Sequence, residues 1–184
     1  MRLAAVVLAA GKATRFGDDK LSALLEGEPL LYHAIRAARA APVERVVVVA
    51  REGQEFGNWP GTPPIELVSL ASDELSTSLK AGLAVVPETD GVFIFLGDMP
   101  RVTHDLASEL AAALADNFAA VPRHEGCTGH PVLLSARSYP QIAQLTGDAG
   151  AGKLLKSRDD IAYVDSDDPG ILLDVDRPED LNNV

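Results

Sequence analysis

Short apolar runs recur along this 184-residue chain, and several of them are continuous rather than alternating. Continuous runs are typical of strands that are covered on both faces. Helix-like stretches separate them, and repeated crossovers through helices favour a mostly parallel sheet. We therefore predict an α/β fold, a three-layer sandwich with a mostly parallel central sheet. The runs lie at 3–9, 44–50, 65–70, 91–96, 118–122, 130–134, 161–165 and 171–176.

Three longer stretches between these runs carry helix signals. The stretch 29–41 begins with Pro29, and proline suits the first position of a helix. The stretch 76–86 begins with hydroxyl residues that suit an N-cap, and 103–117 has Thr103 as its expected N-cap. The glycine-rich second half of the chain is more irregular. We expect a single domain over 1–184, with a small lid or acceptor-binding subregion at about 123–170.

The charge balance limits the classes of partner. Aspartate and glutamate number 27 against 16 lysines and arginines, which gives a formal net charge of −11. This charge repels polyanions, so we expect neither nucleic acid nor a membrane surface as a partner. No apolar run approaches the roughly 20 residues of a membrane span. The single cysteine, Cys127, cannot form an intramolecular disulfide, and we expect a cytoplasmic protein.

A basic, glycine-containing loop follows the first apolar run. It does not match a Walker A loop, because five residues separate Gly11 from Gly17 and Asp18 follows instead of lysine. It also lacks the G-x-G-x-x-G dinucleotide fingerprint. Its position at the carboxyl end of a strand, with Arg15 and Lys20 as bases, favours binding of a polyphosphate. An ordinary strand-to-helix loop with solvated charges is the alternative, and the residues alone support the two about equally.

Carboxylates follow two other apolar runs. Asp98 comes directly after 91–96, and Asp174 and Asp176 lie two residues apart, on one face if the segment is extended. Carboxylates at strand ends can hold Mg²⁺, with water and substrate phosphates completing its coordination. The alternatives are a turn or capping role for Asp98 and a solvated edge for the pair. Their occurrence beside the basic loop favours the metal hypothesis.

Six motifs in sequence order resemble the MobA-like nucleotidyltransferase family, and most of all its molybdenum cofactor cytidylyltransferase type. The resemblance spans nearly the whole chain. It implies a Rossmann-like α/β fold and transfer of a nucleoside monophosphate from an NTP, here CTP, to the phosphate of a pterin cofactor, with release of pyrophosphate. The motifs are L-A-A-G-x-x-x-R-x-G-x-x-K at 8–20, S-x-S-L at 76–79, G-D-M-P at 97–100, G-H-P-V at 129–132, G-D-x-G-A at 147–151 and D-x-D-x-P-E-D-L at 174–181.

The resemblance also implies roles for individual residues, with the nucleotide half at about 1–122. Arg15, Lys20 and Asp98 are the expected catalytic residues, and Lys20 is expected to stabilise the α-phosphorus. The expected Mg²⁺ ligands are Asp98 and Asp176, with Asp174 beside them. The remaining nucleotide-binding positions are Leu8, Ala9, Ala10, Gly11, Ser76 and Ser78. The acceptor is expected near Gly129, His130, Asp148 and Gly150. A molybdoenzyme or its chaperone is a further expected partner.

Some positions depart from the family pattern. Thr128 stands where an arginine often precedes Gly-His, and Gly152, followed by Lys153, stands where the G-D-x-G-A motif usually continues with arginine. Two guanidinium groups that a phosphorylated acceptor uses are therefore missing. GTP as donor, or a sugar or alcohol phosphate as acceptor, therefore remains an alternative. A non-catalytic partner in molybdoenzyme maturation is a third hypothesis, which the intact set of bases and carboxylates disfavours. For His130 the alternative to contact with the acceptor is a purely structural role. We expect Cys127 to have no functional role.

Overall fold

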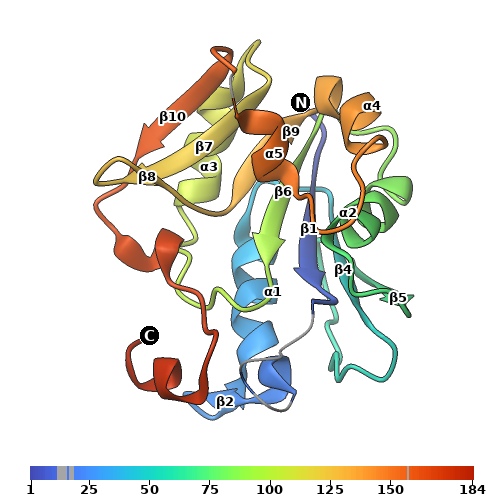
Figure 1. The fold of residues 1–184 in the computed structure, drawn as a ribbon, viewed down its shortest axis with the longest axis vertical. Coiled ribbons are helices and arrows are strands. Elements are labelled where there is room, and N and C mark those ends of the chain that lie inside the picture. Colours follow the sequence, from blue (N-terminus) through green and yellow to red (C-terminus); the bar gives the residue numbers. More distant parts are fainter. Residues whose placement is uncertain (12–15, 17–18, 157) are drawn as a thin grey trace.

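The computed structural model describes residues 1–11, 16, 19–156 and 158–184, and all of its described strands except a small separate hairpin form one large, mostly parallel sheet (Figure 1). The α/β fold expected from the sequence is confirmed. The order across the sheet is β10-β7-β9-β6-β1-β4-β5, and β9 runs antiparallel to both of its neighbours. The strands are β1 (Leu3–Ala9), β4 (Arg45–Arg51), β5 (Ile65–Leu70), β6 (Gly91–Leu96), β7 (Ala119–His124), β8 (Cys127–Thr128, paired with β7), β9 (Val132–Ser135) and β10 (Ile161–Asp165).

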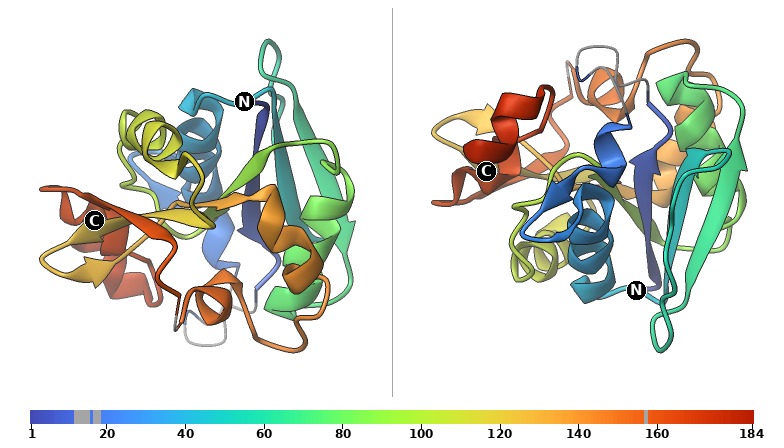
Figure 2. Two further views of the ribbon diagram at one scale, coloured as in Figure 1. Left: turned by 90° about the horizontal axis from the view of Figure 1, so that it is seen from above. Right: turned by 90° about the horizontal axis from the view of Figure 1, so that it is seen from below.

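Helices cover both faces of this sheet, which gives three layers (Figure 2). Helices α1 (Leu30–Ala40) and α3 (Leu106–Leu114) lie on one face. Helices α2 (Leu75–Ala84), α4 (Tyr139–Ile142) and α5 (Ala151–Leu155) lie on the other. The central parallel strands β1, β4 and β6 are therefore buried from both sides, which explains why their sequences read as unbroken apolar runs, whereas the outer strands β5 and β10 are partly exposed.

Strand β1 shows how the two cores form. Ala5 and Val7 point into the core beneath α1 and α3, whereas Ala4 and Val6 point into the core beneath α2. All four are fully buried. Alternation of side chains across a strand delivers both sets from one short segment. The strand is thus held on both faces, and its carboxyl end projects from a rigid base.

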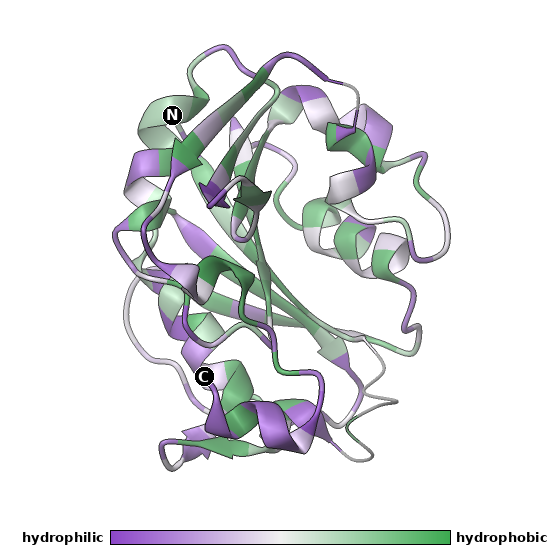
Figure 3. Cartoon of the chain, turned by 60° about the vertical axis from the view of Figure 1, so that its left-hand side comes forward, coloured by the Kyte–Doolittle hydropathy of each residue, from purple (hydrophilic) through white to green (hydrophobic). Residues whose placement is uncertain are grey.

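A third, small cluster joins the C-terminal segment to a hairpin that the sequence did not predict. The hairpin consists of β2 (Leu24–Leu25) and β3 (Glu28–Pro29). The buried members of the cluster are Leu25, Leu30 and Val175, and Phe16, Leu181 and Val184 pack against them. Figure 1 shows the C-terminus beside this hairpin, and Figure 3 shows the polar colouring of much of the C-terminal segment. Val175 thereby anchors the segment that carries Asp174 and Asp176.

The strand predicted at 171–176 is wrong. A 3₁₀ helix, η3 (Pro169–Leu172), occupies its beginning, and the residues that follow belong to no strand. The carboxylate of Asp168 accepts a hydrogen bond from the N–H of Gly170 at 2.8 Å and caps this turn. Proline, glycine and a capping aspartate thus favour a tight turn here over extension into a sheet.

Three predicted helix starts also differ from the structure. Helix α2 begins at Leu75 after Glu74, so Ser76 lies inside its first turn and is not the N-cap. Helix α3 begins at Leu106 after Asp105, three residues beyond the expected start at Thr103. Pro29 is the residue before α1 rather than its first residue. Among the described helices, none combines the length and the apolar character that crossing a bilayer requires.

Candidate active site

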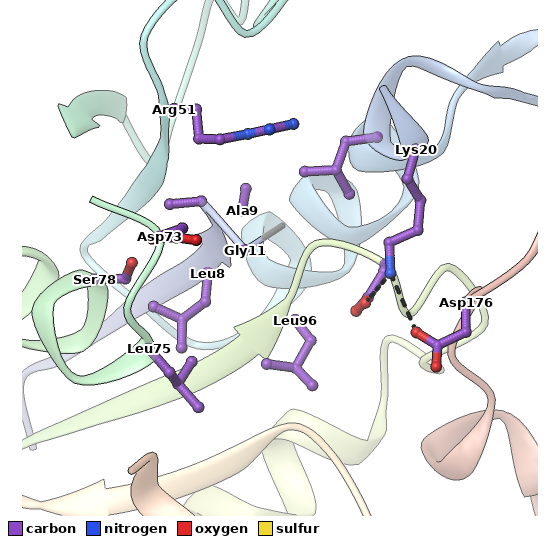
Figure 4. Close-up of a pocket in the computed structure, with 13 residues that line it drawn as sticks. Leu8, Ala9, Gly11, Lys20, Arg51, Asp73, Leu75, Ser78, Leu96 and Asp176 are labelled. Atoms are coloured by element: carbon purple, nitrogen blue, oxygen red, sulfur yellow. Dashed lines mark hydrogen bonds and ion pairs between the residues drawn. The ribbon is translucent and has the colours of Figure 1, made fainter. Parts of the chain in front are cut away.

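A pocket of about 280 Å³ lies at the carboxyl ends of β1, β4 and β6 (Figure 4). Open α/β sheets characteristically bind ligands at this edge, outside the carboxyl ends of their parallel strands. Apolar side chains line one part of the pocket and charged groups line another, as a nucleotide requires. The lining residues are Leu8, Ala9, Ala10, Gly11, Lys20, Leu21, Arg51, Asp73, Leu75, Ser78, Leu96, Asp98 and Asp176.

The segment from Leu8 to Gly11 forms the floor of this pocket. Leu8 and Ala9 end β1, and Ala10 is buried directly after it. Ala9, Ala10 and Gly11 carry small side chains or none, so a ligand can approach the backbone there at close range. The prediction that all four residues share one site is therefore consistent with their positions. Arg15, which is predicted to share this site, lies outside the described residues.

Lys20 brings a positive charge to the pocket from the 3₁₀ helix η1 (Lys20–Ser22). Its Nζ donates a hydrogen bond to Oδ2 of Asp98 at 2.7 Å and lies 3.5 Å from Oδ1 of Asp176. The exposed fractions of the side chains are 11% for Lys20, 24% for Asp98 and 41% for Asp176, so the contact with Asp98 is the better shielded from bulk water. Figure 4 shows the ammonium of Lys20 directed toward the carboxylate of Asp176, at the charged end of the pocket.

Asp98 is aimed at Lys20 by a tight turn after β6. The N–H of Gly97 donates to the carbonyl of Leu8 at 2.9 Å, so the chain stays against β1 for one further residue. A Cβ on Gly97 would lie 3.2 Å from both this carbonyl oxygen and Cβ of Ala9. Glycine therefore permits the close approach that places the next residue, Asp98, over the end of β1.

The C-terminal segment reaches the same point through the backbone of Asp98. The N–H of Val175 donates to the carbonyl of Asp98 at 3.0 Å, which sets Asp174 and Asp176 on either side. The carboxylate of Asp180 then accepts from the N–H groups of Asp176 and Arg177 at 2.9 and 2.7 Å. Asp180 lies in the motif at 174–181, but the sequence analysis assigned it no role. Its hydrogen bonds hold the backbone at Asp176, so it is a positioning residue.

Asp98, Asp174 and Asp176 consequently form a carboxylate cluster. One oxygen from each of the three lies within 4.8 Å of the others. Desolvation by the surrounding protein, together with the charges of Asp176 and Asp98, raises the pKa of Asp174. A divalent cation among the three would relieve this repulsion, and hard carboxylate oxygens are the ligands that Mg²⁺ and Mn²⁺ prefer. The donor set therefore fits the metal that the sequence predicts.

Two charged lining residues were missed by the sequence analysis. Arg51 is the last residue of β4, and Asp73 lies between β5 and α2. Both follow apolar runs, so the argument that identified Asp98 applied to them as well. The guanidinium of Arg51 lies 4.0 Å from the carboxylate of Asp19, beside Lys20 in sequence. A second cation is thus present at the mouth of the pocket.

The two predicted serines have different positions. Ser78 lines the pocket, and its hydroxyl donates to the carbonyl of Glu74 at 3.2 Å. Ser76 does not line the pocket and is 1% exposed. Its N–H donates to the carbonyl of Gly147 at 3.1 Å, whereas its hydroxyl has no hydrogen-bond partner among the described residues. Ser76 thus connects α2 to the loop that carries Asp148 and Gly150.

None of the four predicted acceptor residues lines the 280 Å³ pocket. Asp148 is exposed, and Gly150 precedes α5, where an added Cβ would lie 2.5 Å from Cδ2 of Leu75. Leu75 itself lines the pocket, so the loop around Gly150 borders it. The prediction that this loop contacts the acceptor stays a prediction.

Gly129 and His130, the other two predicted acceptor residues, pack against Ile171 of η3. The N–H of His130 donates to the carbonyl of Ile171 at 3.0 Å, and Nδ1 lies 3.3 Å from the carbonyl of Ile94. Nδ1 must carry the proton for that contact to be a hydrogen bond, which leaves Nε2 unprotonated in the neutral ring. Burial lowers the pKa of His130 and keeps the ring neutral. Both residues therefore have a structural role, whatever they contact in addition.

Comparison with known proteins identifies the family. A family model described as the MobA-like NTP transferase domain matches residues 5–161. The chain belongs to the MobA-like NTP transferase family. It is therefore a nucleotidyltransferase, and the resemblance found in its motifs is confirmed. The match covers β1, the pocket floor, Lys20, Asp98 and the loops around Gly129 and Asp148, whereas Asp174 and Asp176 lie beyond it.

Three relatives show the range of this MobA-like NTP transferase group. The chain is 30% identical to "Purine catabolism protein PucB" of Bacillus subtilis, with 99% of this chain and 95% of that protein covered. It is 28% identical to the molybdenum cofactor cytidylyltransferase of Escherichia coli, with coverages of 96% and 92%. It is 32% identical to a probable molybdenum cofactor guanylyltransferase of Pyrococcus horikoshii, with coverages of 67% and 63%.

Solved structures agree with the fold. An Rv0371c homologue from Mycobacterium sp. strain JC1 superposes with a TM-score of 0.84 at 29% identity, with 100% of this chain and 96% of that chain covered. Rv0371c of Mycobacterium tuberculosis, solved as a complex with manganese, gives a TM-score of 0.82 at 24% identity, with coverages of 100% and 97%. The fold of this chain is thus shared with these solved structures.

Proposed function

We propose that this nucleotidyltransferase moves CMP from CTP to a phosphorylated acceptor, the molybdenum pterin cofactor, and releases pyrophosphate. One observation carries the proposal: Lys20 and the carboxylates of Asp98 and Asp176 meet at the charged end of a pocket whose floor is Leu8–Gly11. The similarity to the cytidylyltransferase of Escherichia coli, over 96% of this chain, supports cytidine as the base.

The proposed roles follow from the arrangement of the pocket. The apolar part, with Leu8 and Leu75, accommodates base and ribose, and the small residues of the floor orient them. Lys20 and Arg15 contact the phosphates, and Lys20 stabilises charge that develops at the α-phosphorus. Asp98 and Asp176, with Asp174 beside them, would hold Mg²⁺, which neutralises triphosphate charge when bound.

No general base is required for this reaction. The acceptor phosphate is already ionised at neutral pH, so the protein needs only to position it in line with the α-phosphorus. We propose that Gly129, His130, Asp148 and Gly150, in the subregion at 123–170, contact this acceptor. Cys127 is exposed on β8, and no role for it is proposed.

A second candidate keeps the reaction and changes the donor or acceptor. Two similarities support this second candidate. One is the 30% identity to a protein named for purine catabolism, and the other is the similarity to a probable guanylyltransferase. Thr128 and Gly152 point the same way, because arginines at these two positions would bind a phosphorylated pterin. The structure of the nucleotide pocket is shared by both candidates.

Pyrophosphate release separates these candidates. Each NTP is offered in Mg²⁺, with and without molybdopterin, and then with sugar or alcohol phosphates as acceptors. The proposal predicts release only when CTP and the pterin are both present. Release with GTP, or with another acceptor, would support the second candidate. Nucleotide binding without any release would support a non-catalytic role and contradict both.

A further inference from the structure

The ammonium of Lys20 lies among the oxygens that the proposed metal would need. Nζ is 2.7 Å from Oδ2 of Asp98 and 3.5 Å from Oδ1 of Asp176. Oxygens of these same residues and of Asp174 lie within 4.8 Å of one another. The ammonium therefore supplies one positive charge to a group of three carboxylates. A lysine and a divalent cation cannot both occupy that small volume without repulsion.

Lys20 also lines the pocket proposed for the nucleotide. Its side chain is 11% exposed, so the charge cannot simply turn into bulk water when it leaves its partners. A buried charge that loses its partner is strongly unfavourable. The phosphates of a nucleotide in the pocket would provide replacement acceptors for its three N–H groups.

We infer that Lys20 is the counter-ion of the carboxylate cluster in the nucleotide-free protein, and that a divalent cation binds by exchange with it. The displaced ammonium turns toward the phosphates of the nucleotide. This inference rests on the proposed function, because it uses the metal and the nucleotide assigned there. It assigns to Lys20 a regulatory role in addition to contact with the phosphates.

The exchange makes metal and nucleotide binding interdependent. Metal alone must displace the ammonium from Asp98 and Asp176 without offering it new acceptors, so it binds weakly. Nucleotide alone finds Lys20 held by Asp98. When both are present, the metal takes the carboxylates and the phosphates take the lysine, and each ligand raises the affinity for the other by the same factor. The free protein is thereby kept from binding divalent cations without substrate.

Titration of the full chain with Mn²⁺ alone tests the exchange directly. Free Mn²⁺ is followed by electron paramagnetic resonance at pH 8, without nucleotide, for the wild type and Lys20→Met. Methionine has a similar length but no charge. We expect Lys20→Met to bind Mn²⁺ about tenfold tighter or more, in line with the effect of one neighbouring charge on a carboxylate. Equal or weaker binding by this variant would overturn the inference.

Two controls separate this inference from the proposed function. Lys156→Met removes the same charge from an exposed position after α5, and we expect unchanged Mn²⁺ affinity. A gain as large as that of Lys20→Met would show a general field effect and overturn the inference. Asp98→Asn in the Lys20→Met background should lose the tight site. If Mn²⁺ affinity is retained there, the metal binds elsewhere and the metal site of the proposed function is wrong.

A second measurement uses the unaltered protein. The ¹⁵N-labelled ammonium group of Lys20 is observed by NMR before and after addition of Mg²⁺ with a non-hydrolysable CTP analogue. Exchange predicts a change in the ammonium signal and the appearance of coupling to phosphorus. An ammonium that keeps the same signal while Mg²⁺ and the analogue are bound would contradict the inference.

Discussion

Lys20 and Asp98 are separated by 78 positions in sequence and meet through a hydrogen bond of 2.7 Å. Their meeting depends on the ends of two neighbouring parallel strands, because Lys20 follows β1 and Asp98 follows β6. Asp176 joins them from a segment that is not part of the sheet. Single substitutions in this group are therefore expected to change the chemistry of the site.

Asp98→Asn tests the chemistry at this scale. The backbone carbonyl that receives the N–H of Val175 is retained, so the C-terminal segment should stay in place. The amide cannot provide the charge for a divalent cation, and we expect pyrophosphate release to fall by at least about 100-fold. Asp116→Asn, at an exposed carboxylate after α3, is the matched control. Full activity in Asp98→Asn, with an unchanged melting temperature, would contradict the metal assignment.

His130→Asn tests the neutral state of the buried imidazole. Burial lowers the pKa of His130 from its ordinary value of 6.5, so the folded protein binds this proton less readily than the unfolded chain. The stability due to the neutral ring is therefore complete above pH 6.5 and declines as the pH falls. Between pH 7.5 and 5.5 the wild type should lose about 1 kcal/mol more than His130→Asn, because one pH unit corresponds to about 1.4 kcal/mol.

Urea unfolding at the two pH values measures this difference. Asparagine can still donate a hydrogen bond to the carbonyl of Ile94, so the variant preserves the contact made by Nδ1. The exposed His104 provides a control, since His104→Asn should lose stability in parallel with the wild type. A parallel loss in His130→Asn would mean that the ring is protonated in the folded protein.

At the level of elements, the end of β8 and the turn η3 are packed together at Gly129. A Cβ at this position would lie 2.3 Å from the carbonyl oxygen of Ile171, which is backbone and cannot move aside cheaply. The same segment continues to Asp174 and Asp176. Gly129 thus affects both stability and the position of the proposed metal ligands.

Gly129→Ala should be destabilised by about 1–3 kcal/mol, the usual cost of overpacking. Gly152→Ala provides the comparison, because Gly152 lies in α5 with no atom within 4 Å of an added Cβ. Alanine there should be neutral or stabilising by up to about 1 kcal/mol, since it favours a helix. Chemical denaturation measures both variants. Equal stabilities for the two would show that the close contact with Ile171 is relieved at little cost.

Much of the sheet was predictable at this scale because its strands are covered on both faces. The continuous runs in β1, β4 and β6 follow directly from that burial. The segment 171–176 has the same apolar character, but Pro169 and Gly170 begin a turn and no sheet edge receives the residues that follow. Local pattern cannot show whether an edge is available, and this is why that prediction failed.

The site was predictable to a similar degree. Asp98 and Lys20 could be identified because strand ends in parallel sheets converge. Asp176 was identified through a wrong strand, and its true position depends on Val175 and Asp180, two contacts with no local signature. Arg51 and Asp73 were missed although they follow strands as Asp98 does. Contacts between residues far apart in the sequence place Asp176, and a local sequence pattern does not reveal such contacts.

At the level of the whole molecule, the net charge of −11 opposes the binding of an anionic nucleotide. Binding must then depend on the local cations and on the metal. A non-hydrolysable CTP analogue with Mg²⁺, at 100 times its dissociation constant, should stabilise the protein by about 2.7 kcal/mol. For a chain of this size that corresponds to a rise of roughly 5–10 °C in melting temperature.

Thermal unfolding with each component alone completes this test. We expect Mg²⁺ alone or the analogue in EDTA to give much smaller rises, because each lacks the partner that offsets charge in the site. The Asp98→Asn variant should lose most of the joint effect. A full rise in EDTA would show that the nucleotide binds without the metal and would contradict the proposed dependence.

The central claim is that this site transfers a nucleoside monophosphate. Transfer of label from CTP, labelled at either the α- or the γ-phosphorus, tests it most directly, with Mg²⁺ and molybdopterin present. We predict that the α-label moves to the pterin while the γ-label leaves as pyrophosphate, and that Asp98→Asn does neither. Transfer of the γ-label to the pterin, or release of phosphate with no labelled pterin, would contradict the claim.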